Sequence, residues 1–205
     1  IAYFGSLLLR KVGFSHFVCL VGALLFSFSG YVILGGTWYI FSIEALYFVM
    51  ILYGIECVLS NEKPFVLPIS ICLTACYQPV ILFVFGFFVA LYLLIRFASK
   101  GIVISKINGI ATIRILLLTI LGIGISAVIS IPTIHQIINS PRVSGNVSMF
   151  DTLMSKGLGL ESLQFYGTAI MRFFSNDTLG TGMQYKGWSN YMEAPVFYSG
   201  ILTLM

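Results

Sequence analysis

Long apolar runs are the feature that most constrains how this chain can fold. A helix needs about 20 predominantly apolar residues to cross the hydrocarbon core of a bilayer. Such runs cover residues 17–36, 38–59, 64–97 and 114–138, and another begins at Val196. Of the 205 residues, 59% are hydrophobic and only 9% are charged, whereas soluble domains carry about 25% charged residues. The sequence therefore predicts an all-α integral membrane protein, a polytopic bundle of transmembrane helices.

The run at 64–97 is interrupted by "TACYQP", residues 74–79. It is too long for one straight span at about 1.5 Å per residue, and Pro79 removes a backbone donor in its middle. Two short helices that meet at Tyr77, Gln78 and Pro79 fit this pattern, and one tilted, kinked helix is the alternative. Irregular backbone at membrane depth is tolerated only where it lines protein or a water-filled cavity, so Tyr77 and Gln78 are candidate site residues.

The basic residues predict the orientation. If the 64–97 run is a hairpin, they share one membrane face, which the positive-inside rule assigns to the cytoplasm. Residues 1–138 then hold transmembrane helices, 139–195 form a long extracytoplasmic loop, and 196–205 start a further transmembrane helix. The basic residues on the predicted cytoplasmic face are Arg10, Lys11, Lys63, Arg96, Lys100, Lys106 and Arg114.

Within the loop, residues 160–174 have the spacing of an amphipathic helix lying on the membrane surface. Gly167 weakens that pattern. The residues predicted to face lipid are Leu163, Tyr166, Ile170 and Phe174.

Polar groups beside aromatic rings gather near the end of the loop, in "GWSNYMEAPVFYSG", residues 187–200. Proteins grip sugars with such combinations, although aromatic belts at the membrane interface use the same rings without a ligand. For Trp188 and Tyr198 the belt interpretation is favoured. The candidate sugar or acceptor residues are Asn176, Asp177, Trp188, Asn190, Tyr191 and Glu193.

Two further charged residues are candidates for a site. Glu44 lies about two turns inside the second span, where an ionised carboxylate is costly unless it faces a wet cavity or a partner; a neutral glutamate with a structural hydrogen bond is the alternative. Arg142 lies just outside a span, where a guanidinium can hold a phosphate bidentately, and an ordinary interfacial arginine is the alternative. Glu56 is expected to reach the lipid headgroups.

Several function classes lack sequence support. The chain has no G-x-G-x-x-G, Walker A, G-x-S-x-G or H-E-x-x-H motif. Its dispersed basic residues do not indicate a nucleic-acid partner. The cysteines lie in apolar stretches without the ligand set of a metal site, so buried free thiols are predicted. No cofactor is evident, and a requirement for a divalent metal stays open.

The segments "VGALLFSFSGYVI", "LTACYQPVILF", "SAVISIPTIHQIINSPRVSG", "RFFSNDTLGTG" and "GWSNYMEAPVFYSGILTL" resemble, in that order, the YfhO-type bacterial membrane proteins. That family is similar to the GT-C glycosyltransferases, polytopic enzymes that use a polyprenyl-phosphate sugar as donor on the outer membrane face. The resemblance implies a GT-C-like protein of the bacterial cytoplasmic membrane. It further implies sugar transfer to a cell-envelope polymer such as lipoteichoic acid.

The resemblance also implies roles for the candidate residues. Tyr77, Gln78 and Pro79 would border the donor lipid, and Arg142 would meet its phosphate. GT-C enzymes place their catalytic acid in the first external loop, and this sequence is expected to begin after that loop, so the catalytic base is expected upstream. The residues implied to face the sugar or acceptor are Asn176, Asp177, Asn190 and Glu193. The weaker catalytic candidates are Glu44, Asp177 and Glu193.

Two other classes of function remain open at this point. A lipid or glycan transporter would also explain an intramembrane carboxylate and a broken helix pair, but such proteins are often built from inverted repeats, and the sequence shows none. A noncatalytic membrane scaffold would need no acid in the upstream loop.

Overall fold

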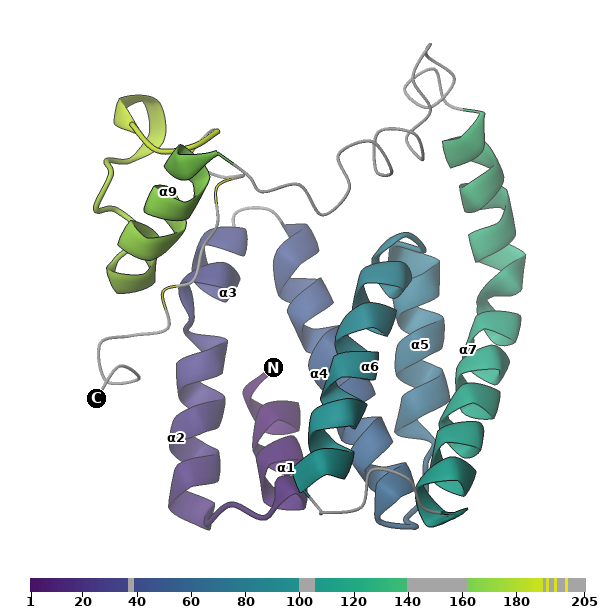
Figure 1. The fold of residues 1–205 in the computed structure, drawn as a ribbon. Coiled ribbons are helices and arrows are strands. Elements are labelled where there is room, and N and C mark those ends of the chain that lie inside the picture. Colours follow the sequence, from purple (N-terminus) through teal and green to yellow (C-terminus); the bar gives the residue numbers. More distant parts are fainter. Residues whose placement is uncertain are drawn as a thin grey trace. The chain divides into compact units, whose positions relative to one another are not determined.

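The structure is a computed structural model that describes residues 1–36, 39–99, 106–139 and 162–189, together with Tyr191, Ala194 and Tyr198. Every regular element in these ranges is a helix (Figure 1). Three helical segments, Ile40–Leu59, Ile81–Ser99 and Gly109–Ile137, are long and apolar enough to cross a membrane. The prediction of an all-α membrane protein is confirmed. The helices are α1 (Ala2–Val12), α2 (His16–Ser27), α3 (Gly30–Gly35), α4 (Tyr39–Leu59), α5 (Val66–Tyr77), α6 (Ile81–Ser99), α7 (Lys106–Ile138) and α9 (Leu163–Phe174), with a 3-10 turn at Gly182–Gln184.

The chain divides into two compact units. The first unit comprises Ile1–Leu9, Phe14–Leu46 and Phe150–Met205, and therefore joins α2, α3 and α9. The second unit comprises Arg10–Gly13 and Tyr47–Met149, and holds α5, α6, α7 and most of α4.

In the first unit, the apolar run at 17–36 is broken into α2 and α3 rather than forming one span. The chain leaves the helical conformation at Phe28 (φ −105°, ψ 16°) and is extended at Ser29 (φ −62°, ψ 154°). The cause lies far along the sequence. A Cβ atom on Gly30 would fall 2.4 Å from Nδ2 of Asn176, and the Gly30 N–H donates to the carbonyl of Tyr198 at 2.6 Å. The break thus accommodates a later segment of the chain.

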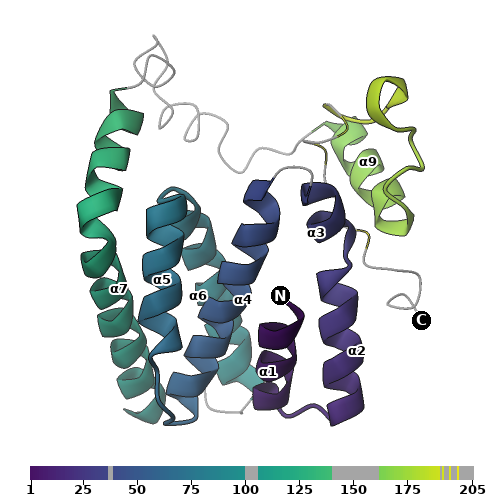
Figure 2. The ribbon, with the colours of Figure 1, turned by 180° about the vertical axis from the view of Figure 1, so that it is seen from behind.

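In the second unit, α5 and α6 run side by side and are joined at one end (Figures 1 and 2). Gln78 caps both helices. Its N–H donates to the carbonyl of Thr74 at 2.8 Å, and its own carbonyl accepts from the N–H of Ile81 at 3.1 Å. Because the turn satisfies its own backbone groups, the chain reverses here instead of continuing as one kinked helix.

The core of the second unit lies where α5 packs between α4 and α7. Its buried side chains come from all three helices: Ile51, Ile55, Val58, Leu67, Ile71 and Ile115. Glycines allow the close approach, since a Cβ on Gly54 would lie 2.7 Å from the backbone nitrogen of Leu67, and one on Gly122 would lie 2.7 Å from the carbonyl oxygen of Pro68. Lipid tails are as apolar as leucine, so tight packing of this kind, rather than the hydrophobic effect, holds membrane helices together.

Charged groups of the second unit meet around the C-terminal end of α4. The carboxylate of Glu56 accepts from Arg96 Nε at 2.7 Å, Arg96 Nη2 at 3.0 Å and the Tyr92 hydroxyl at 2.6 Å. Glu56 is only 1% exposed, so the expectation that it reaches the headgroups is wrong; the half-buried side chain of Arg96 binds it there. Two residues just after α4 also have partners: Glu62 pairs with Lys11, and the side chain of Asn61 accepts a hydrogen bond from Arg114.

Two glycines on α7 allow a matched test of the packing. Gly122→Ala should destabilise the protein by about 1–3 kcal/mol, because the new methyl group forces α5 and α7 apart. Gly124→Ala should have little effect, since nothing lies within 4 Å of a Cβ at Gly124. Thermal unfolding in detergent measures both, and equal stability of the two variants would contradict the proposed role of Gly122.

A second pair of variants tests the buried ion pair. Glu56→Gln should cost about 3–5 kcal/mol, because it leaves the Arg96 guanidinium without its counter-charge. Glu62→Gln removes the exposed partner of Lys11 and should cost less than about 1 kcal/mol. Denaturant unfolding in mixed micelles compares them, and a Glu56→Gln protein as stable as Glu62→Gln would show that the pair contributes nothing.

Candidate functional site

A fully buried arginine organises the loop region of the first unit. Arg172, on α9, is 0% exposed. Its Nε donates to the carbonyl of Asn176 at 3.1 Å, and its Nη1 donates to the carbonyls of Tyr191 at 3.0 Å and Ala194 at 3.3 Å. One side chain therefore ties α9 to three later points of the chain.

The charge of Arg172 is balanced without a carboxylate among the described residues. Its guanidinium carbon lies 4.9 Å from the ring centroid of Tyr191 and 5.4 Å from that of Tyr185, distances at which cation–π attraction operates. Nη2 is buried and has no hydrogen-bond partner in the described part of the chain. Backbone carbonyls and aromatic faces thus stabilise this buried charge, which in most proteins is paired with an acidic side chain.

The first half of α9 fixes the segment around Trp188. Ser162 caps the helix by accepting from the N–H of Phe165 at 3.2 Å. The hydroxyl of Thr168 accepts from the N–H of Trp188 at 2.9 Å, and the rings of Phe165 and Trp188 pack edge to face with centroids 5.0 Å apart. Gln164 also donates to the carbonyl of Gly187 at 3.3 Å. The indole of Trp188 is therefore held against α9.

Two predicted site residues, Asp177 and Tyr191, are brought into direct contact. The hydroxyl of Tyr191 donates to Oδ1 of Asp177 at 2.6 Å. Burial raises the pKa of Tyr191, and the hydrogen bond to Asp177 raises it further. Asp177 itself is exposed, so the site presents an oriented carboxylate to the surface.

The side chain of Asn176, which was expected to face the sugar or acceptor, lies against Gly30. Its buried Oδ1 has no hydrogen-bond partner among the described residues. The nearby hydroxyl of Ser29 is buried and unpartnered in the same sense. The Asn176 side chain therefore fits the notch between α2 and α3.

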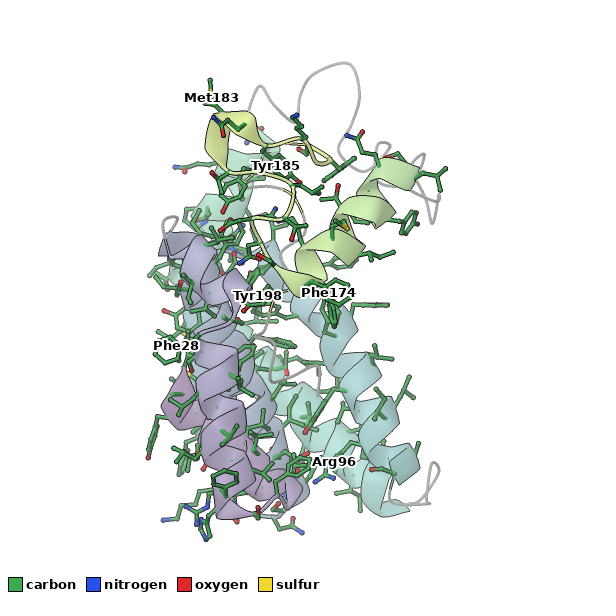
Figure 3. All side chains as sticks on the ribbon, turned by 90° about the vertical axis from the view of Figure 1, so that its left-hand side faces the viewer. Phe28, Arg96, Phe174, Met183, Tyr185 and Tyr198 are labelled. Atoms are coloured by element: carbon green, nitrogen blue, oxygen red, sulfur yellow. The ribbon has the colours of Figure 1, made fainter. Side chains whose placement is uncertain are left out.

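Asp177, Trp188 and Tyr191 thus belong to one cluster with Arg172 and Tyr185; Figure 3 labels Tyr185 within it. The sequence analysis missed both Arg172 and Tyr185. The sequence does contain one indication that Arg172 is buried. It lies in an apolar helical segment, and the residues one turn away, Thr168 and Asn176, are uncharged, so no acidic side chain on the same face pairs with it. Arg142, Asn190 and Glu193 lie outside the described residues.

Glu44 is buried, at 5% exposed. The hydroxyl of Tyr31 donates to its Oε2 at 3.4 Å, and the hydroxyl of Ser42 donates to the carbonyl of Val32 at 3.1 Å. These contacts join α3 to the start of α4. In the described ranges, no three His, Cys, Asp or Glu side chains come together as metal ligands.

The second unit contains the predicted donor residues and an apolar cavity. The ring of Tyr77 packs edge to face on Tyr47, with centroids 6.0 Å apart, next to the capping residue Gln78. The cavity has a volume of about 330 Å³. Helices α4, α5, α6 and α7 line it, with Ile55, Ile71, Phe85, Val89, Ile115 and Thr119 among the lining residues.

Three helical segments of spanning length and apolar composition define a polytopic helical membrane protein. The family described as "Bacterial membrane protein YfhO" matches residues 1–180, and the chain belongs to that family. No curated protein and no solved structure matches it.

Replacing Arg172 tests whether it anchors the loop. Arg172→Lys should speed amide hydrogen exchange across residues 176–188 by roughly tenfold or more, because lysine lacks the guanidinium fork and charge-assisted hydrogen bonds contribute about 1.5–3 kcal/mol each. Lys186→Gln, which neutralises an exposed residue of the same segment, should leave exchange unchanged. Unaltered protection in Arg172→Lys would remove the anchoring role.

Proposed function

We propose that this protein is a membrane glycosyltransferase that moves a sugar from a polyprenyl-phosphate donor to a cell-envelope polymer such as lipoteichoic acid. The family is associated with glycosyltransferase function. The observation that carries the proposal is the contact between Asp177 and Tyr191, which holds an exposed carboxylate beside aromatic rings. Sugar-binding proteins combine flat aromatic faces with hydrogen-bonding groups in this way.

A hollow whose lining begins at Thr178, directly after Asp177 in the sequence, supports a place for the sugar or acceptor. Thr178, Gln184 and Lys186 contribute donors and acceptors to its lining, and Leu179 and Gly180 complete it. A hydroxyl, an amide and an ammonium group can hydrogen-bond the hydroxyls of a sugar. Asn190 and Glu193 are proposed to extend this set.

The donor lipid is proposed to bind at the second unit. Its hydrocarbon tail fits the chemistry of the apolar cavity below the α5–α6 turn, while Tyr77 and Gln78 border the lipid. Arg142 is proposed to meet the phosphate, since a guanidinium binds phosphate oxygens bidentately.

The protein is proposed to lie in the bacterial cytoplasmic membrane with the loop at 139–195 on the outer face. The cluster of Lys11, Arg96 and Arg114 near the C-terminal end of α4 supports this orientation, because basic residues favour the cytoplasmic side.

The proposed reaction is an inverting substitution at the anomeric carbon of the sugar. A carboxylate takes the proton of an acceptor hydroxyl, the hydroxyl oxygen forms the new bond to carbon, and the lipid phosphate leaves with the bonding electrons. A cation such as Arg142 stabilises the departing phosphate. Asp177, Glu193 and Glu44 are weak candidates for the base.

The test is transfer of radiolabelled sugar from a polyprenyl-phosphate donor to envelope polymer, in membranes that contain the full-length protein. Arg142→Ala and Glu193→Gln should each lower transfer by at least tenfold. Tyr191→Phe should lower it less, because it keeps the ring over Arg172 and only frees the Asp177 carboxylate. Glu62→Gln, far along the sequence from these residues, serves as the folded control.

Normal transfer by Arg142→Ala would exclude the phosphate-binding role of that residue. If the folded parent protein transfers no sugar from any polyprenyl-phosphate donor, the enzyme proposal is wrong, and lipid transport or a scaffolding role takes its place.

A further inference from the structure

Helix α9 has the reverse of the pattern expected at a water-exposed surface. The side chains that it buries are polar: Thr168 is 2% exposed and Arg172 is 0% exposed. Its outward stripe is apolar, with Leu163 90%, Ile170 61% and Phe174 58% exposed. Met171 and Phe173 flank this stripe and are also exposed. A water-facing helix would present the polar residues and bury the apolar ones.

Contacts within the first unit place the C-terminal end of α9. The residues after α9 meet the α2–α3 break, because the Asn176 side chain packs against Gly30. Gly30 lies within the apolar run at 17–36, so the C-terminal end of α9 adjoins an apolar stretch of the chain.

Figure 3 labels Phe174 at the lower end of α9, the end from which the chain continues to Asn176. Amphipathic helices at membrane surfaces bury their apolar faces about 5–10 Å deep.

We propose that α9 is a membrane-inserted wedge whose apolar face, Leu163, Ile170, Phe173 and Phe174, lies in the hydrocarbon of the nearby leaflet, with Phe174 deepest. The occupant of this face is a lipid bilayer. Arg172 makes the arrangement possible, since its charge is turned inward and balanced there, so that no charged group of α9 enters lipid. This inference does not depend on sugar transfer.

Added tryptophans test the wedge in the full-length protein in lipid nanodiscs. Phe174→Trp and Ile170→Trp place a fluorophore on the apolar face, and Met183→Trp places one on the fully exposed 3-10 turn. Fluorescence added over the parent should be quenched at least twofold by lipids brominated in their acyl chains for the first two variants, and more for Phe174→Trp than for Ile170→Trp when the bromines lie deep. Met183→Trp should be quenched by aqueous acrylamide instead.

Two results would overturn the wedge. Quenching of Phe174→Trp by acrylamide and not by brominated lipid would mean that α9 faces water. Quenching by neither would mean that another protein surface, such as a second copy of the chain, covers the face. If Phe174→Trp does not fold, as judged by its thermal transition, Ile170→Trp on the same face carries the same test.

Discussion

Every backbone N–H and C=O inside a bilayer must find its partner within the protein, and this constraint shapes the chain wherever its apolar helices are interrupted. The two described breaks meet it differently. At Gln78 the turn satisfies its own backbone groups, because the Gln78 N–H donates to the last turn of α5 and its carbonyl accepts from the first residue of α6. At Gly30 the N–H depends on the carbonyl of Tyr198, far along the sequence. The first break is local, whereas the second exists only as part of the tertiary structure.

The half-buried Arg96 and the fully buried Arg172 also differ in how the protein satisfies them. Arg96 is held by the carboxylate of Glu56, a pairing of opposite charges within the second unit. Arg172 uses carbonyls and tyrosine faces instead, which leaves the carboxylate of Asp177 free of that task and oriented by Tyr191. Because Arg172 is not paired with a carboxylate among the described residues, Asp177, the only aspartate of the loop that the structure describes, can face outward.

These differences explain what the sequence could predict. Hydrophobic length predicted α4 and most of α7, because crossing a bilayer requires it, and helical periodicity predicted α9 to within a few residues of its start. For the run at 64–97 the sequence left two helices or one kinked helix open, and the structure has α5 and α6. Pro79 marked the local break. The interruption at Phe28 and Ser29 carries no proline, and it forms because Asn176 and Tyr198 come back to Gly30.

The candidate site was predictable in part for the same reason. Composition identified Asp177, Trp188 and Tyr191 as polar and aromatic groups near the interface. It could not pair Asp177 with Tyr191 or bring Arg172 against the rings of Tyr185 and Tyr191, since these contacts depend on how the loop folds back on α9. The extra length of α7, from Lys106, and the helix α1 were also missed, because charged residues within them shortened the apolar runs.

The notch at Gly30 has a consequence for biosynthesis. The first unit is assembled from three separate stretches of chain, and nearly all of the second unit lies between the second and the third of them. A ribosome that has reached residue 149 has supplied all of the second unit but neither Asn176 nor Tyr198. The Gly30 N–H at the α2–α3 break gains its native partner only after Tyr198 has been made. Translation order therefore lets the second unit close before the first.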